Sequence, residues 1–502
     1  MLANQREREL KLAVNGTFML PDLSDPSLGV LEVRDLPELD LVSTYHDTPD
    51  LRLARAGVTL RYRSGDEGGP IWTLKLRVAG NDGSVRDELT FPGEPDSIPV
   101  AALDLVTALS RACALEPVAT LRTRRRRWLL CAGGERELAE LVDDDVMILD
   151  GEEIRARFRE LELESRGPDL DQLIPIAERL QLAGAVLAEP VPKAVRAMGP
   201  RAAAPADLAP IQVQVSDPAG RAVQAAITAG AIRLTENDAG TRLGEEEPLH
   251  QMRVATRRLR SDLRTFGLLL EPAWTAELSE ELDWLGGCLG TVRDLDVQIG
   301  GLEAMAGDLR DDLAPLLDPL REKRDGARAD LLTALRLPRY TALLDRLVDA
   351  SHSPALTGAA EAPIETALPP LLAAAWRRLA REGRSLRPDD PDERYHAVRI
   401  LAKRARYAAE AIGPVLEGGG KRQLSFASAA ARLQDLLGSL QDAVVGAKLI
   451  QERAAISRDP RFSMAAGRLY ERELAIRSRA RSSYPVAWRR VRRAGERLTE
   501  RE

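Results

Sequence analysis

An internal duplication in the C-terminal half constrains the fold of this chain more than any other feature of its sequence. The segment His250-x-x-Arg253-x-x-x-Arg257-Arg258-x-Arg260 matches His396-x-x-Arg399-x-x-x-Lys403-Arg404-x-Arg406, at an offset of 396 − 250 = 146 residues. Downstream, Leu289-Gly290-Thr291-Val292-Arg293-Asp294 matches Leu437-Gly438-Ser439-Leu440-Gln441-Asp442 at an offset of 148 residues. Two matches in the same order at nearly one offset predict a repeated structural unit. Helical spacing recurs from 219 to 496, so we expect both copies to be bundles of helices.

The rest of the chain predicts a separate domain. A chain of 502 residues is too long to fold around one ordinary hydrophobic core. Residues 199–215 read GPRAAAPADLAPIQVQV, an Ala/Pro-rich stretch without periodicity that is typical of a linker. We therefore predict an N-terminal domain at 1–198 and a helical domain at 216–502, with repeats at about 216–350 and 365–502.

The N-terminal domain reads as strands whose charged residues share a face. Alternate side chains of a strand point the same way, so Glu7, Glu9 and Lys11 lie on one side. Five further strands show the same pattern: Arg61 with Arg63, Arg86 with Glu88, Arg124 with Arg126, Glu140 with Asp144, and Glu160 with Glu162 and Glu164. The intervening residues are often Leu or Val, which favours a closed antiparallel sheet with a charged interior and two helices outside, near 99–114 and 169–184.

This mixture of side chains indicates a chemistry. Arginine and lysine donate hydrogen bonds to phosphate oxygens, whereas clustered glutamates offer the hard oxygen ligands that Mg²⁺ or Mn²⁺ prefers. Acids and bases share one interior most readily when a metal ion bridges carboxylates to a polyphosphate. The net charge of −7 argues against a protein that covers nucleic acid nonspecifically. The local Arg clusters favour anionic ligands that bind at limited sites.

In order along the chain, these residues resemble the CYTH domain of the triphosphate tunnel metalloenzymes. The match comprises Glu7-x-Glu9-x-Lys11, Tyr45-His46-Asp47-Thr48-Pro49-Asp50, Leu60-Arg61-x-Arg63, Trp72-x-x-Lys75, Arg86-x-Glu88 and Glu160-Leu161-Glu162-Leu163-Glu164. The resemblance implies an eight-stranded tunnel that binds triphosphates with a divalent metal ion. Phosphate would be bound by Lys11, Arg61, Arg63, Lys75, Arg86 and Arg124 or Arg126. Metal would be held by Glu7, Glu9, Asp144, Glu162 and Glu164, with Glu7, Glu9 and Lys11 as catalytic residues.

Two positions stay open at this level. The family more often has two tyrosines where this chain has Tyr45-His46, so His46 either faces solvent, the structural reading that we favour, or joins the site. The run Asp143-Asp144-Asp145 leaves the family's single aspartate ambiguous, and we choose Asp144 because it shares strand parity with Glu140.

The helical repeats carry acid-poor cationic stripes. At about 100° per residue, His250, Arg253, Arg257 and Arg260 fall within roughly an 80° stripe, as do His396, Arg399, Lys403 and Arg406. No acidic residue lies between 395 and 407, so we expect an external anion to offset the repulsion. The repeats resemble the CHAD domain, over about 216–502. That resemblance implies binding of inorganic polyphosphate, including on polyphosphate granules.

These readings together predict an inorganic triphosphatase with a polyphosphate-binding helical domain. Three alternatives remain: a non-catalytic polyphosphate-binding or granule-targeting protein, an adenylate cyclase, and a thiamine triphosphatase. Neither stripe has the interleaved aromatic residues that are typical of proteins that bind single-stranded nucleic acid, so we do not expect nucleic acid as a ligand. Without a signal peptide or long apolar run, and with three cysteines lacking metal-type spacing, we expect a cytoplasmic protein that has no membrane partner.

Overall fold

The structure is a computed structural model, and it describes residues 4–7, 9–77, 86–133, 136–167, 170–187 and 191–498. Side chains are described for these residues except 4–7, 86 and 170. The chain divides into two compact units, Met1–Asp207 and Leu208–Glu502. The first is built on an antiparallel sheet and the second is helical, which confirms the predicted fold class.

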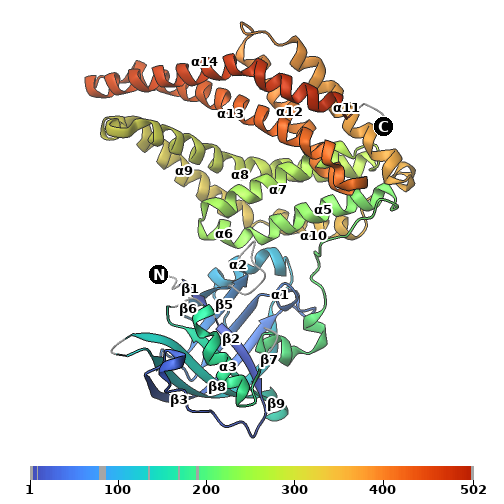
Figure 1. Cartoon of the computed structure of the whole chain (residues 1–502). Coiled ribbons are helices and arrows are strands. Elements are labelled where there is room, and N and C mark those ends of the chain that lie inside the picture. Colours follow the sequence, from blue (N-terminus) through green and yellow to red (C-terminus); the bar gives the residue numbers. More distant parts are fainter. Residues whose placement is uncertain are drawn as a thin grey trace. The chain divides into compact units, whose positions relative to one another are not determined.

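The first unit contains ten strands within the described residues, together with short helices (Figure 1). The strands are β1 (Asn4–Glu7), β2 (Glu9–Val14), β3 (Glu32–Asp47), β4 (Thr59–Ser64), β5 (Ile71–Arg77), β6 (Arg86–Phe91), β7 (Glu116–Cys131), β8 (Glu137–Asp150), β9 (Glu153–Ser165) and β10 (Val186–Leu187). The helices are α1 (Arg52–Arg55), α2 (Val100–Ser110), α3 (Ile174–Leu182) and α4 (Lys193–Met198). The helices that we predicted near 99–114 and 169–184 correspond to α2 and α3.

The sheet closes on itself through its N-terminal segment. Its strand order is β1-β6-β5-β4-β3-β7-β8-β9-β2-β10, and the named pairs are antiparallel. β1 pairs with β6 at one end of this order and β2 pairs with β9 at the other, yet only residue 8 separates β1 from β2 in the chain. With β1 and β2 counted as one segment, eight strands form the closed part, as the resemblance implied. β10 adds two residues beside β2.

On β2 and β9, strand alternation sorts the side chains into an apolar outer face and a charged inner face. Leu12, Leu161 and Leu163 are fully buried against Ile176 and Leu180 of α3. Their neighbours in sequence, the charged residues of β2 and β9, therefore point to the interior. Burial of the leucines beneath α3 stabilises the wall and fixes which charges face inward.

The first unit includes part of the range that we predicted as a linker. A 3-10 turn at Pro200–Ala203 places Ala202 against Leu51 and Ala54. Asp207 then forms ion pairs with Arg55 at 2.9 Å and with Arg111 at 2.6 Å. These contacts hold the segment from 199 to 207 on the first unit.

The second unit consists of helices that follow the duplication. The first copy contains α5 (Ala219–Glu236), α6 (Asp238–Leu243), α7 (Glu246–Thr265), α8 (Pro272–Ala306), α9 (Ala314–Leu335) and α10 (Pro338–His352), and the second contains α11 (Ile364–Ser385), α12 (Asp392–Ile412), α13 (Lys421–Ile456) and α14 (Pro460–Glu496). α12 begins 392 − 246 = 146 residues after α7, the offset of the His/Arg segment.

Long helix pairs extend from the body of this unit. α8 runs beside α9 and α13 beside α14, as Figure 1 shows. Where the pairs meet, Leu302 and Leu316 pack in one apolar cluster with Ile450, Phe462 and Leu469. The cysteines Cys113, Cys131 and Cys288 are free thiols. Among the described residues, no helix has the length and apolarity that crossing a membrane would need.

Candidate functional sites

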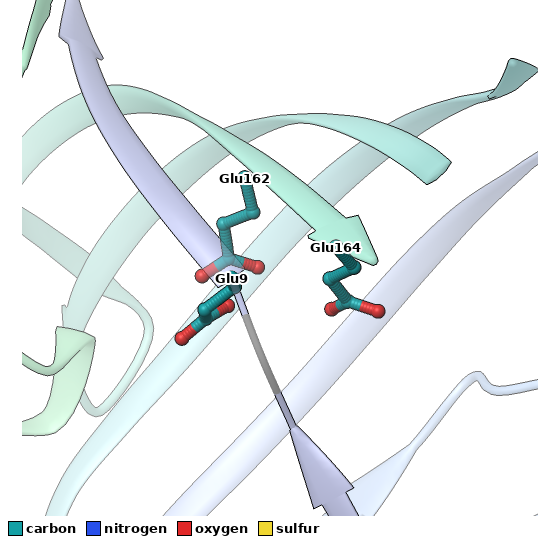
Figure 2. Close-up of side chains that lie close together, drawn as sticks. All are labelled: Glu9, Glu162 and Glu164. Carbon is teal, nitrogen blue, oxygen red and sulfur yellow. The ribbon is translucent and has the colours of Figure 1, made fainter. Parts of the chain in front are cut away.

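Three glutamates converge on the interior of the tunnel. In the register between β2 and β9, Glu9 lies opposite Glu164 and Lys11 opposite Glu162. Glu9, Glu162 and Glu164 can each offer one carboxylate oxygen such that the three atoms lie within 4.8 Å of one another. Figure 2 shows the three side chains on these neighbouring strands, on the same side of the sheet. Three carboxylates so arranged suit a hard divalent cation.

The glutamates share their cavity with a cationic wall. The cavity, of about 70 Å³, is lined by Glu9, Lys11, Tyr45, Thr59, Arg61, Arg63, Lys75, Arg125, Glu162, Glu164, Pro192, Lys193 and Ala194. Of the side chains that we predicted as phosphate ligands, Lys11, Arg61, Arg63 and Lys75 are therefore brought together, with the metal candidates Glu9, Glu162 and Glu164 beside them. The mixed charge places a binding site for both an anion and a cation in one space.

Two adjacent guanidinium groups carry excess positive charge. Arg61 and Arg63 alternate along β4, so both face the cavity. The charge of Arg61 and then burial lower the pKa of Arg63 to about 10, against the opposing effect of Asp66. A group whose charged form is destabilised in this way gains stability when an anion binds next to it. This wall of the tunnel thus offers hydrogen-bond donors and positive charge to an anion.

Internal ion pairs hold the remaining lining residues. Lys11 Nζ donates to Glu162 Oε1 at 2.8 Å and lies 3.1 Å from Glu9 Oε1. Lys75 pairs with Glu88 at 3.0 Å. Burial would raise the pKa of Glu162, but the charges of Lys193, Lys11 and Arg125 hold that pKa well below its usual range. Glu162 is consequently a carboxylate, the form that a metal ion binds.

The interpretation of strand β7 was wrong. Arg124 and Arg126 are 66% and 48% exposed and pair with Glu38 and Asp143 on the outer face. Arg125 is only 16% exposed and lines the cavity, donating to Asp144 at 2.8 and 2.7 Å and to Glu162 at 3.1 Å. Because four consecutive arginines put two on each face, their alternation could not choose between faces. Leu121 and Thr123 share the parity of Arg125 and are buried too, but buried leucines lie on the outer face in β2 and β9, so this parity gave no usable signal in the sequence.

The aspartate run resolves in favour of Asp144 facing inward. Its side chain is fully buried and pairs with Arg125 and Lys193, whereas Asp143 pairs with Arg159 and Asp145 with Arg157. Burial would raise the pKa of Asp144, but Lys193 and Arg125 lower it below its usual value. Asp144 is not part of the three-glutamate cluster, so its role as a metal ligand stays a prediction.

Sequence reasoning missed Lys193. It lies at the start of α4, where its Nζ is 3.0 Å from Glu162 and 3.3 Å from Glu160. Ala194 of the same helix packs against Tyr45, Leu121 and Val146 and so covers part of the cavity. No strand periodicity predicts this contact, because α4 follows the last long strand and reaches the interior only through the fold.

Three further predictions have separate outcomes. The side chains of Glu7 and Arg86 lie outside the described residues, although their Cα atoms are register partners between β1 and β6. His46 is 8% exposed and its ring lies 4.8 Å from that of Trp72, while Tyr45 lines the cavity. His46 is therefore buried beside Trp72, so it does not face solvent as we expected, and it is not among the residues that line the cavity. Burial lowers its pKa, in keeping with a neutral core residue.

The two cationic stripes face each other in the second unit. α7 contacts α12, and a cavity of about 220 Å³ between them is lined by Arg257, Arg260, Ser261, Arg264, Ile400, Lys403, Arg404 and Tyr407. Of the predicted residues, Arg257, Arg260 and Lys403 line this cavity, and Arg264 and Arg404 join them. The guanidinium groups of Arg257 and Arg406 lie 5.6 and 5.5 Å from the ring of Tyr407.

Charge in this groove is only partly balanced. Burial, then Arg257 and Arg399, lower the pKa of Lys403 to about 8. Burial and nearby arginines also lower the pKa values of His250 and Arg253. Sequence reasoning did not foresee the acids that pair with the stripes. Asp294 and Asp283 come from α8 and pair with Arg253 at 2.7 Å and Arg260 at 2.5 Å, whereas Glu410 lies one turn after Arg406 on α12 and pairs with it at 2.7 Å.

Comparisons with known proteins agree with the two units. Residues 5–197 match the family model of the CYTH domain and residues 225–451 that of the CHAD domain. Uncharacterized protein MT2285 of Mycobacterium tuberculosis strain CDC 1551 / Oshkosh and Uncharacterized protein Rv2226 of strain ATCC 25618 / H37Rv are each 31% identical to this chain, covering 93% of it and 92% of the relative.

Solved structures resemble the chain in part. PptA from Streptomyces chartreusis is 25% identical, covers 54% of this chain and 100% of its own, and has a TM-score of 0.46. The CHAD domain from the plant Ricinus communis is 24% identical, covers 58% of this chain and 98% of its own, and has a TM-score of 0.44. On the two family models and the full-length relatives, the chain belongs to the family of proteins that carry a CYTH domain followed by a CHAD domain.

Proposed function

We propose that the tunnel hydrolyses inorganic triphosphate with the help of a divalent metal ion, Mg²⁺ or Mn²⁺. The observation that carries this proposal is the position of three glutamates, Glu9, Glu162 and Glu164, in the same cavity as the guanidinium pair Arg61 and Arg63. A metal-bound triphosphate presents both a cation and an anion, and this cavity offers ligands for each.

The residues present fit a hard cation. Glu9, Glu162 and Glu164 would hold it, because three carboxylate oxygens within 4.8 Å form a compact donor set. When bound, such an ion neutralises phosphate charge and lowers the pKa of a coordinated water. Arg61, Arg63 and Lys75 would bind the phosphoryl oxygens and stabilise the charge that develops on them.

Other residues keep the carboxylates in place. Lys11 lies between Glu9 and Glu162 and so positions both while keeping an ammonium group at the cavity. Arg125 and Lys193 hold Glu162 from two other directions. Because these contacts exist before a ligand arrives, little reorganisation would be needed during phosphoryl transfer.

The lining favours an inorganic substrate over a nucleotide or thiamine triphosphate. Tyr45 is the one aromatic residue among those that line the cavity in the described part of the chain. The other lining residues are Thr59, Pro192, Ala194 and charged side chains, so these described residues offer no second aromatic face to enclose a stacked nucleobase or thiazole ring. Adenylate cyclase and thiamine triphosphatase activities are accordingly the less favoured alternatives.

A phosphate-release panel tests the proposal. The full chain is assayed with tripolyphosphate, ATP, thiamine triphosphate and long-chain polyphosphate, with Mg²⁺, with Mn²⁺ and with chelator. We expect metal-dependent release from tripolyphosphate, and its loss in Glu9→Gln, which keeps the side-chain shape but removes a ligand charge. Asp40→Asn, on the exposed face of the sheet beside Arg122, is the matched control. Undiminished release in Glu9→Gln would refute the ligand assignment, and no release from any substrate would favour a protein that only binds polyphosphate.

We also propose that the helical unit binds long-chain polyphosphate, including on granules. The supporting observation is the groove between α7 and α12, where Arg257, Lys403 and their neighbours outnumber the acids that face them. The test is binding of long-chain polyphosphate to the full-length Glu9→Gln variant, with duplex and single-stranded DNA as competitors over a salt series. Preferential displacement by DNA would reject the proposal in favour of nucleic-acid binding.

A further inference from the structure

The two repeats differ at a position that the duplication itself defines. The offset of 148 residues aligns Arg293 of α8 with Gln441 of α13, and the offset of 146 aligns His250 of α7 with His396 of α12. In the second repeat, His396 Nδ1 and Gln441 Oε1 share a hydrogen bond of 2.9 Å. The imidazole of His396 and the amide of Gln441 thus satisfy each other's hydrogen-bonding capacity, and the amide carries no charge.

In the first repeat the same position is cationic. His250 Nδ1 and Arg293 Nε are both buried atoms with no hydrogen-bond partner among the described residues. The guanidinium of Arg293 acts, after burial, to lower the pKa of His250. One phosphate group between them could accept hydrogen bonds from both side chains, and its charge would favour the protonated form of His250.

Arg253 adds a third donor, and the motif that contains Gly290 explains its position. A Cβ atom at residue 290 would lie 2.3 Å from Arg253 Nη1, so the glycine allows this guanidinium to lie against α8. In the second repeat a Cβ atom at Gly438 would lie 3.7 Å from Arg399 Nε, an ordinary contact. Only the first repeat therefore depends on its glycine to seat the arginine.

Acids lie near the arginines of both repeats. Asp294, which pairs with Arg253, is 72% exposed, so water screens the pair. Its counterpart Asp442 is exposed as well; burial of part of the group raises its pKa, Arg399 acts against that rise and Asp294 adds to it. Glu247 likewise acts on the pKa of His250, and Arg293 on that of Asp296. The repeats therefore differ in the hydrogen bond between His396 and Gln441 and not in the presence of acids.

From these differences we infer that His250, Arg253 and Arg293 form a phosphate subsite that the second repeat lacks. This subsite would take one phosphate group of a bound polyanion more tightly than the matching position at His396. The inference rests on the proposed polyphosphate binding, and it adds an arginine from α8 to the two stripes. It also gives the repeats unequal roles along the groove.

Exchange of the two aligned residues tests the inference. Arg293→Gln copies the second repeat and Gln441→Arg copies the first, and each full-length variant is titrated with long-chain polyphosphate, tripolyphosphate and orthophosphate. We expect Arg293→Gln to weaken polyphosphate binding by about tenfold, the scale of one charge-assisted hydrogen bond, and Arg293→Lys to restore most of it. Gln441→Arg should tighten binding. Arg346→Gln, whose guanidinium pairs with Glu277 on α8, is the control and should bind as the wild type does.

The outcomes distinguish a failure of the proposed function from a failure of the subsite. Wild-type protein that fails to bind polyphosphate refutes the proposed function. Wild-type binding that survives Arg293→Gln unchanged overturns the subsite, as does an equal loss in His250→Gln and His396→Gln. Gly290→Ala should weaken binding and Gly438→Ala should not, in variants whose unfolding temperatures match that of the wild type. Orthophosphate as tight as polyphosphate would identify a site for the free anion and contradict a polyanion subsite.

Discussion

Asp262 gives the helical unit a pH-dependent stability. It lies on α7 with its side chain 2% exposed, and its Oδ1 atom has no hydrogen-bond partner among the described residues. Burial raises its pKa from 3.8 to about 8, although Arg258 acts against this rise and Glu410 adds to it. Arg258 itself is engaged by Glu410 at 3.1 Å. The perturbation that we consider is Asp262→Asn, which keeps the shape and removes the titration.

The magnitude follows from the two pKa values. The folded state binds this proton more tightly than the unfolded state, so stability falls as the pH rises from about 4 to about 8 and is constant above that range. Each pH unit in this window costs about 1.4 kcal/mol, which gives an upper limit of about 5–6 kcal/mol at pH 8. Local opening that admits water to the carboxylate reduces the observed value.

The assay is urea or thermal unfolding of the full chain at pH 5, 6, 7 and 8, followed by the helical signal of the second unit. We expect Asp262→Asn to gain stability relative to the wild type with each step in pH, and to exceed it by several kcal/mol at pH 8. Asp283→Asn, which removes a carboxylate that is 61% exposed, is the control and should leave the pH profile parallel to that of the wild type. Parallel profiles for Asp262→Asn and wild type would refute the reasoning.

Two further predictions test the tunnel and the groove. Arg125→Ala should lower triphosphate turnover by at least about tenfold, because it removes the ion-pair partner of Asp144 and Glu162. Arg124→Ala, which removes an exposed side chain, should change turnover little. Equal effects of the two substitutions in a phosphate-release assay would contradict the placement of Arg125. Polyphosphate affinity should be nearly constant from pH 7 to pH 8 and fall by up to about tenfold per pH unit above that, because Lys403, with a pKa of about 8 among arginines on α7 and α12, must then take up a proton on binding. Lys403→Arg, which copies Arg257 of the first repeat, should remove this dependence in titrations from pH 6 to 9.5, and a persistent fall would assign it to another group.

The sequence by itself determined the order of domains, the duplication and most of the tunnel interior. Alternation works where one face of a strand is apolar: Leu10 and Leu12 leave no doubt that Glu9 and Lys11 point inward, because the leucines must be buried. The helical offset of 146 residues was likewise sufficient to align α7 with α12. Both signals are local and periodic, so they need no knowledge of distant contacts.

Tertiary structure decided the residues that lack such a signal. Four consecutive arginines in β7 carry no alternation, so only the pairing of β7 with β8, and of β8 with β9, shows that Arg125 reaches Asp144 and Glu162. Lys193 enters the cavity from a helix far along the chain, and Arg293 meets His250 from a neighbouring helix. The electrostatic partner of a side chain depends on which elements pack together. A single segment of sequence therefore fixes the direction of a charge but not the charges that it will face.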